Sequence, residues 1–259
     1  MLGAMIGDVV GSVYEWHNIK TEDFIFFKSD CFFTDDTVLT AATAKALMRG
    51  LNYVEVYQDF ARRYPGRGYG GNFSHWINTE NPQPYNSWGN GSAMRVSPVG
   101  FAFDTVEEVL AEAERSAAVT HNHPEGIKGA KAIALAIFLA RQGFTQEDIR
   151  HEITDRFNYD LNRSLDEIRP GYRFDVSCQG SVPEAIIAFL ESTSYEDAIR
   201  KAISIGGDSD TIACITGGIA EAFYDGVPED IAKQGRSFLP EEILNIIDAF
   251  EECFRDLHL

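Results

Sequence analysis

The amino-acid sequence predicts an all-α fold, a single compact multi-helix domain that spans residues 1–259. Apolar residues recur every three to four positions over long stretches, which is the spacing of one face of an α-helix. Several of these stretches begin with a Ser or Thr that is followed three residues later by an acid, the signature of a capping box. Strand candidates are few and short, at residues 24–27, 101–103 and 172–176, and they form no alternating series that could build a sheet domain.

Helical segments are expected throughout the chain, roughly ten in all. In chain order they cover residues 36–49 and 53–64, a segment after the Thr105 and Glu108 capping box, residues 124–142, a segment after Thr145 and Asp148, residues 181–192, a segment after Ser194 and Asp197, and two C-terminal segments. Pro124 suits a first helical turn, and Gly143 is a typical stop. The apolar faces of the C-terminal segments consist of Ile212, Ile215, Ile219 and Phe223, and of Ile243, Ile247, Phe250, Phe254 and Leu257.

Three long irregular regions separate the helices, at residues 16–34, 65–95 and 157–180. Loops of this length in a compact domain are usually functional or mobile. No internal repeat, low-complexity tract or linker divides the chain, so we expect one domain.

Composition and charge exclude several classes of protein. The chain has 22 Lys and Arg against 40 Asp and Glu, a net charge of −18, which disfavours binding to nucleic acid or to an anionic membrane surface. At 44% hydrophobic residues it is too apolar to be disordered. The N-terminus lacks the features of a signal peptide, and the longest apolar stretch, residues 132–140, is about half of a membrane span. Four widely spaced cysteines favour reduced thiols, and together these features predict a cytoplasmic protein.

Three clusters of acids stand out because each lies at a predicted junction of a loop and a helix, with a Gly or Thr beside it. They are Gly7-Asp8 with Gly11 and Glu15, then Thr34-Asp35-Asp36-Thr37, and finally the segment from Gly206 to Thr211 that contains Asp208 and Asp210. A single Asp or Thr at such a junction is a common helix cap. Two or more crowded carboxylates exceed what a cap needs, and their mutual repulsion favours a bound cation. Hard oxygen ligands in this number suit Mg²⁺ or Mn²⁺ rather than zinc.

These clusters, together with the segment from Gly89 to Arg95 and the pair Thr120-His121, resemble the ADP-ribosylglycohydrolase family. The matching motifs run in the family's order from about residue 1 to 225. The resemblance implies an all-α domain with a binuclear Mg²⁺ or Mn²⁺ site that hydrolyses α-linked ADP-ribose conjugates. The implied partners are therefore such conjugates, including ADP-ribosylated proteins.

The resemblance also assigns roles to individual residues of this chain. It implies metal ligands at Thr34, Asp35, Asp36, Asp208, Asp210 and Thr211. It implies substrate contacts at Gly89, Asn90, Gly91, Ser92, Met94, Arg95 and His121. Glu15 matches an acid that reaches the metals in some members of the family, and it is our candidate general acid/base, with Asp36 as the second candidate. Backbone N–H groups of Gly89, Gly91 and Ser92, with Arg95 as a charge partner, would meet the diphosphate.

Two other functions remain open at this stage: an inactive ADP-ribose binder or crystallin-like structural protein, and a metal-dependent phosphohydrolase. The product distinguishes them, since only a glycohydrolase releases ADP-ribose. The acceptor is also open among arginine, serine, an O-acetyl group and a nucleobase. Glu80 lies in a stretch that suits a contact with a guanidinium.

Some motifs point elsewhere but lack the necessary context. Residues 66–71 fit G-x-G-x-x-G, yet they follow a helix rather than a strand, so we expect a loop that borders a cleft instead of a dinucleotide site. His121 and His123 lack a third ligand for zinc. The aromatic residues Tyr14, Trp16, Tyr85 and Trp88 are candidates to stack on adenine or to pack on the core.

Overall fold

The computed structural model describes residues 1–254, and in this part of the chain every regular element is an α-helix. The expected all-α fold is therefore confirmed. In chain order the helices are α1 (Leu2–Gly11), α2 (Asp35–Arg49), α3 (Tyr53–Arg63), α4 (Gly71–Ile77), α5 (Gly91–Met94), α6 (Ser97–Ala102), α7 (Val106–Ala118), α8 (Pro124–Arg141), α9 (Gln146–Phe157), α10 (Leu165–Ile168), α11 (Cys178–Leu190), α12 (Tyr195–Ser204), α13 (Ser209–Phe223), α14 (Glu229–Arg236) and α15 (Glu241–Cys253).

The predicted helix starts coincide with observed caps. The side chains of Thr105, Thr145 and Ser194 each accept a hydrogen bond from the backbone N–H three residues later. Thr34 caps α2, and α8 begins at Pro124 as expected. Each cap satisfies an N–H group that the helix itself leaves unpaired. Leu257 of the last apolar face lies outside the described residues.

The strand candidates are not strands. Residues 24–27 and 172–176 are irregular, and Phe101 belongs to α6 while Phe103 follows it in an extended conformation. Among the described residues, Gly89 and Ser177 pair in an isolated antiparallel bridge. Short aromatic segments such as these have strand propensity, but packing against helices decides their conformation.

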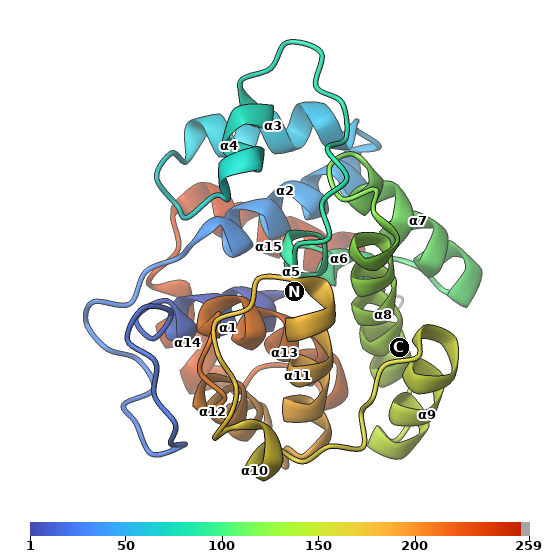
Figure 1. The fold of residues 1–259 in the computed structure, drawn as a ribbon. Helices are drawn as coiled ribbons and strands as arrows, with labels where there is room; N and C mark the ends of the chain where they lie inside the picture. The colour runs from blue at the N-terminus through green and yellow to red at the C-terminus, as the bar shows by residue number, and fades with distance from the viewer. Residues whose placement is uncertain (255–259) are drawn as a thin grey trace.

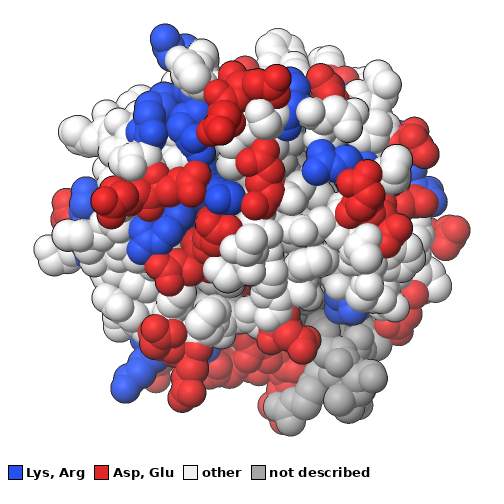
Figure 2. Space-filling view, turned by 90° about the horizontal axis from the view of Figure 1, so that it is seen from below, with Lys and Arg blue, Asp and Glu red and all other residues white. Residues whose placement is uncertain are grey.

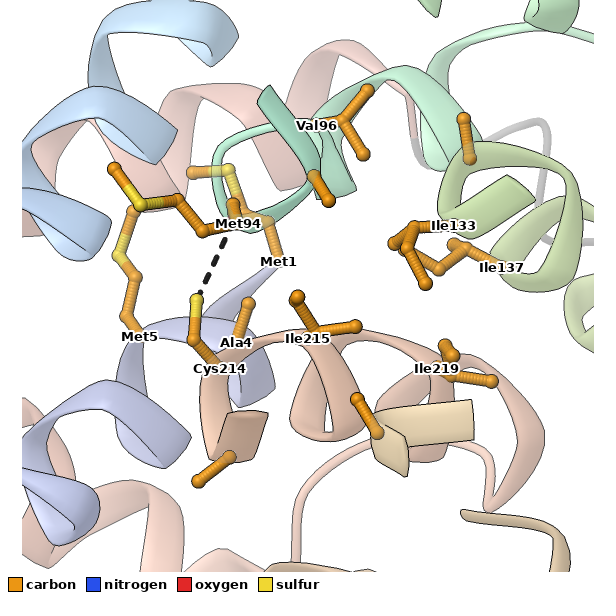
Figure 3. Packing of buried hydrophobic residues seen from close by; sticks show 14 of the residues in the cluster. Met1, Ala4, Met5, Met94, Val96, Ile133, Ile137, Cys214, Ile215 and Ile219 are labelled. Atoms are coloured by element: carbon orange, nitrogen blue, oxygen red, sulfur yellow. Dashed lines mark hydrogen bonds between the residues drawn. The ribbon is translucent and has the colours of Figure 1, made fainter. Parts of the chain in front are cut away.

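Helix α13 lies at the centre of the fold and packs against α1, α8, α11 and α12. Figure 1 shows α2, α3 and α4 on one side of this centre, and α7, α8 and α9 on another. Apolar side chains from α1, α8 and α13 meet in the core, among them Ala4, Ile137 and Ile215 (Figure 3). Cys214 in α13 donates its S–H to the carbonyl oxygen of Met94 at 3.4 Å, which ties α13 to α5.

Glycines allow α1 and α13 to pack with their backbones in contact. A Cβ atom at Gly7 would lie 2.1 Å from the carbonyl oxygen of Ala213, and one at Gly11 would lie 2.5 Å from the Cα atom of Asp210. The sequence pattern predicted such a close approach at Gly7 and Gly11, and the structure confirms it. This contact brings the start of α13 to the end of α1.

The cysteines of the described residues are free, with Cys31, Cys178 and Cys214 buried and Cys253 exposed. Among residues 1–254, the helices are all too short or too polar to cross a membrane. One face of the molecule carries acidic and basic side chains close together rather than a block of one sign (Figure 2).

Candidate active site

A cleft of ≈ 320 Å³ opens between the start of α2, the start of α13 and the long loops. Its lining includes the acidic clusters of α2 and α13 and residues of the segment from Gly89 to Arg95. Gly68, Gly70 and Gly71 also line it, so the glycine-rich segment after α3 borders a cleft as expected.

Asp8 is a fully buried carboxylate on α1 that anchors the start of α2. Its oxygens accept hydrogen bonds from the backbone N–H groups of Thr34 (2.9 Å) and Thr37 (3.1 Å). They also accept from the hydroxyl groups of the same two residues, at 2.7 Å and 2.5 Å. Asp8 therefore fixes the position of Asp35 and Asp36, which lie between these threonines.

Asp36 is buried and has one oxygen without a partner. Its Oδ2 atom lies 3.4 Å from the hydroxyl groups of both Thr34 and Thr211, whereas Oδ1 has no hydrogen-bond partner. Asp35 lies beside it at the start of α2, and its backbone N–H donates to the carbonyl oxygen of Arg67 at 2.8 Å. Such an unpaired buried oxygen is costly unless something fills its coordination.

The acidic cluster at the start of α13 is held by a tight glycine turn. Gly206 and Gly207 both have a φ of +74°, in the left-handed region that favours glycine, and they lead directly into Asp208. The side-chain amide of Asn90 donates to Asp208 Oδ2 at 2.7 Å. Asp210 follows in the first turn of α13, and its Oδ1 atom, like that of Asp36, has no partner.

The two clusters, about 170 residues apart in the chain, meet in the cleft. Asp8, Asp36 and Asp210 each offer an oxygen within 4.8 Å of the others, and so do Glu15, Asp208 and Asp210. Asp210 belongs to both groups. The shared carboxylate joins the two groups into one acidic cluster that could hold metal.

The electrostatics of these carboxylates favour a bound cation. Burial, followed by the charge of Asp210, raises the pKa of Glu15 to about 7, and burial raises the pKa of Asp208 to about 6. Burial and neighbouring carboxylates hold the pKa values of Asp35, Asp36 and Asp210 well above their ordinary range. The ion pairs of the described residues do not include these acids. Hard oxygen donors with two unpaired oxygens fit Mg²⁺ or Mn²⁺.

Asn18 holds the loop of Glu15 next to the acidic cluster at the start of α13. The side-chain amide of Asn18 donates to the carbonyl oxygens of Tyr14, Glu15 and Gly207 at 2.7, 2.8 and 2.9 Å. Its oxygen accepts from the backbone N–H of Gly207 at 2.8 Å. Asn18 thus ties the loop of Glu15 to the turn that precedes Asp208.

Most of the predicted substrate-binding residues also line the cleft. Gly89, Asn90, Gly91, Met94, Arg95 and His121 face the cleft, whereas Ser92 is buried and donates its hydroxyl to the carbonyl oxygen of Gly126 at 2.7 Å. The N–H of Gly89 is taken by the Ser87 hydroxyl at 3.1 Å. Within residues 1–254 the N–H groups of Gly91 and Ser92 have no hydrogen-bond acceptor. Gly91 lines the cleft, so its N–H remains available to a ligand, whereas Ser92 is fully buried.

The guanidinium of Arg95 is held from behind the wall of the cleft. Its Nη2 atom donates to the carbonyl oxygen of Ser116 at 3.1 Å and to the hydroxyl of Thr120 at 2.8 Å. The group lies over the ring of Tyr57, 4.3 Å from its centroid. The sequence suggested a direct charge partner for the diphosphate and gave no sign of these internal contacts.

The aromatic candidates are divided between core and cleft. Tyr85 lines the cleft, and Tyr14 is buried against Phe24. Trp16 is 72% exposed and stacks on Phe174, which itself lines the cleft. Trp88 is exposed and contacts the ring of His123 edge to face, and that histidine caps α8. Glu80 is exposed and does not line the cleft.

Sequence reasoning missed two residues of the site. Asp8 was assigned no ligand role, although an acid inside an otherwise apolar and buried helix signals a specific partner. Asn18 lies in a loop, and its function depends on Gly207, which is 189 residues away, so no local pattern reveals it.

The chain is similar to known proteins of one family. The family model described as ADP-ribosylglycohydrolase matches residues 1–257. ADP-ribosylhydrolase ARH3 of Mus musculus is 28% identical over an alignment of 328 residues, gaps included. The match covers 94% of this chain and 88% of the relative. ADP-ribosylarginine hydrolase Tri1 of Pseudomonas putida (strain GB-1) is 28% identical over 156 residues, covering 55% of this chain and 40% of that protein.

A solved structure described as an ADP-ribosylglycohydrolase-related protein complex has the same fold. Its TM-score is 0.70 at 22% sequence identity, and the match covers 100% of this chain and 97% of that chain. A family match over nearly the whole chain establishes the relationship. The chain belongs to the ADP-ribosylglycohydrolase family and is a hydrolase that acts on glycosyl bonds.

Proposed function

We propose that the protein hydrolyses the bond between ADP-ribose and an acceptor in a reaction that depends on two Mg²⁺ or Mn²⁺ ions. The observation that carries the proposal is the pair of carboxylate groups that share Asp210. The proposed ligands are Thr34, Asp35, Asp36, Asp208, Asp210 and Thr211. The acceptor is the side chain of an ADP-ribosylated protein, such as arginine or serine, or the acceptor part of a small ADP-ribose conjugate.

The ions supply positive charge that orients the ribose hydroxyls and promotes ionisation of an attacking water. Glu15 is the proposed general acid/base because it lies at the same carboxylate group yet remains partly exposed to the cleft. Asp36 is buried, points one oxygen at the threonines of the site and lacks the access that proton transfer to a leaving group needs. Its position favours a ligand role.

The segment from Gly89 to Met94 and His121 are proposed to bind the ADP part of the substrate. The free N–H group of Gly91 suits an anionic diphosphate. Gly89, Asn90, Met94 and His121 complete the proposed contacts. Tyr85 also lines the cleft and is a candidate to stack on a base.

The product of the reaction tests the proposal. The protein is incubated with ADP-ribosyl-arginine peptide, ADP-ribosyl-serine peptide and O-acetyl-ADP-ribose, each with Mg²⁺, with Mn²⁺ and with a chelator, and products are identified by mass spectrometry. Release of free ADP-ribose that stops with the chelator supports the proposal. AMP or inorganic phosphate would instead indicate a phosphohydrolase, and metal-dependent binding of ADP-ribose without any turnover would indicate an inactive binder.

A further inference from the structure

Arg95 is a fully buried cation that contacts no carboxylate within residues 1–254. An isolated buried charge is expensive, and it persists only where hydrogen bonds and a specific role compensate. It donates two hydrogen bonds from Nη2, to the carbonyl oxygen of Ser116 and to the hydroxyl of Thr120. Thr120 in turn contacts His121, which lines the cleft.

The Thr120 hydroxyl lies 2.7 Å from Nδ1 of His121. A guanidinium has no acceptor, so Arg95 must donate and Thr120 must accept. If Nδ1 carried the ring proton, the hydroxyl proton of Thr120 would have no acceptor in the described part of the chain, although this side chain is fully buried. With the hydroxyl donating to Nδ1, both buried donors are paired, and this is the lower-energy arrangement.

The other ring nitrogen, Nε2, faces the cleft. A Cβ atom at Gly91 would lie 3.2 Å from Nε2, and one at Gly89 would lie 3.5 Å away, so the two glycines leave this edge of the ring uncovered. His121 lines the cleft, and Nε2 has no hydrogen-bond partner among residues 1–254. Burial, followed by the charge of Arg95, holds the pKa of His121 well below its ordinary range, so the neutral ring has one N–H to offer.

We propose that Arg95 and Thr120 are positioning residues that fix the ring proton of His121 on Nε2, where it donates to an oxygen atom of the substrate. The inference rests on the proposed function for the identity of that substrate, an ADP-ribose conjugate, whose ribose and diphosphate oxygens are acceptors. Arg95 then acts through Thr120 rather than by touching the diphosphate. The role of the wall is to present a donor that does not have to reorient when the ligand enters.

The tautomer is measured directly in protein with ¹⁵N-labelled histidine, by long-range ¹H–¹⁵N correlation, with and without Mg²⁺. The expected spectrum of His121, assigned by its loss in His121→Gln, shows a protonated Nε2 and an unprotonated Nδ1. Thr120→Val removes the hydroxyl at nearly constant shape and should give a mixture of tautomers, whereas Thr120→Ser should restore the original pattern. A protonated Nδ1 in the parent protein, a charged ring, or an unchanged pattern in Thr120→Val would each overturn the proposal.

Ligand affinity gives a second readout. Calorimetry with ADP-ribose and Mg²⁺ should show about tenfold weaker binding for Thr120→Val and near-parent binding for Thr120→Ser, since one oriented hydrogen bond is lost and regained. Equal affinities for the parent and Thr120→Val would contradict the inference. If the parent protein binds no ADP-ribose, the proposed function fails, while the spectrum still decides whether the Arg95–Thr120–His121 arrangement exists.

Discussion

Asp210 is the carboxylate on which the acidic site depends most, because it belongs to both groups of possible metal ligands. Asp210→Asn keeps the shape and removes the charge. We expect metal affinity to fall more than about 100-fold, beyond the usual effect of an outer-shell change. The stability of the metal-free protein should rise, because one of several crowded buried charges is gone. Titration calorimetry measures the affinity, and melting in the presence of a chelator measures the stability.

The same crowding predicts how stability depends on pH. Glu15 has a pKa of about 7 in the fold against an ordinary value of 4.5, so the folded protein binds its proton more tightly than the unfolded chain does. A raised carboxylate pKa means that the folded state loses stability as pH rises from about 4.5 to about 7, and no further above that. Glu15→Gln cannot titrate, so in chelator its stability advantage over the parent should grow across this window and then stay constant. A stability difference between Glu15→Gln and the parent that does not change with pH would contradict the raised pKa of Glu15.

At the scale of elements, the contact between α1 and α13 sets the spacing of the carboxylates. Gly7→Ala places a Cβ atom 2.1 Å from the carbonyl oxygen of Ala213, which forces the helices apart. We expect a loss of about 1–3 kcal/mol in the free energy of unfolding, the usual cost of overpacking, together with weaker metal binding. Gly171→Ala meets no atom within 4 Å and is the matched control. Chemical denaturation and calorimetry measure the two effects, and an unchanged metal affinity in Gly7→Ala would show that the spacing is set elsewhere.

Asn18 links the loop after α1 to the turn that precedes Asp208. Asn18→Ala removes the link between Glu15 and Gly207, and we expect turnover to fall by about 10–100-fold while helical circular dichroism stays the same. Asn18→Asp keeps the acceptor for Gly207 N–H but loses the three bonds that the amide donates. It should therefore be as impaired as Asn18→Ala, and near-parent activity in either variant would show that the clamp is dispensable.

The helices that the sequence predicted are those with a local signal. Thr34, Thr145 and Ser194 are followed by acids and apolar residues at helical spacing, and the structure has caps at these residues. The short helices α4, α5 and α10 have too few residues to show periodicity, so packing rather than propensity fixes them. The start of α11 at Cys178 rather than at residue 181 follows from the Ser177 cap, which the pattern did not reveal.

The candidate site was predictable only in part for the same reason. Crowded acids at Asp35, Asp36, Asp208 and Asp210 are visible as local motifs, and the geometry brings them together. That Asp8 faces them, and that Asn90 holds Asp208, are consequences of contacts between distant segments. Spacing along one chain carries no information about such contacts.

At the scale of the whole molecule, the net charge of −18 raises the question of how an anionic diphosphate binds. On the face shown in Figure 2, basic side chains lie among the more numerous acidic ones. Binding of the diphosphate depends on the cleft, where bound cations would offset the charge of the crowded carboxylates. We therefore expect ADP-ribose affinity to fall strongly when divalent metal is removed.

The salt dependence of ADP-ribose binding distinguishes the effect of bound metal from general repulsion between like charges. In chelator, raising NaCl from about 0.02 to 0.2 M should strengthen the residual binding of ADP-ribose, because screening weakens the repulsion between like charges. With Mg²⁺ bound, the same change should alter affinity little. Calorimetry under the four conditions provides the measurement, and ADP-ribose binding that is equally tight with and without metal would contradict the proposed site.

The pairing of α1 with α13 also determines when the site can form during synthesis. Asp8 leaves the ribosome about 200 residues before Asp210, which is roughly 10–40 s at usual elongation rates. During that interval Asp8 has no Asp210 to share a cation with, and the glycine face of α1 has no helix to cover it. The nascent chain must therefore keep the apolar α1 segment from aggregating until α13 emerges, and metal binding can stabilise the protein only after that point.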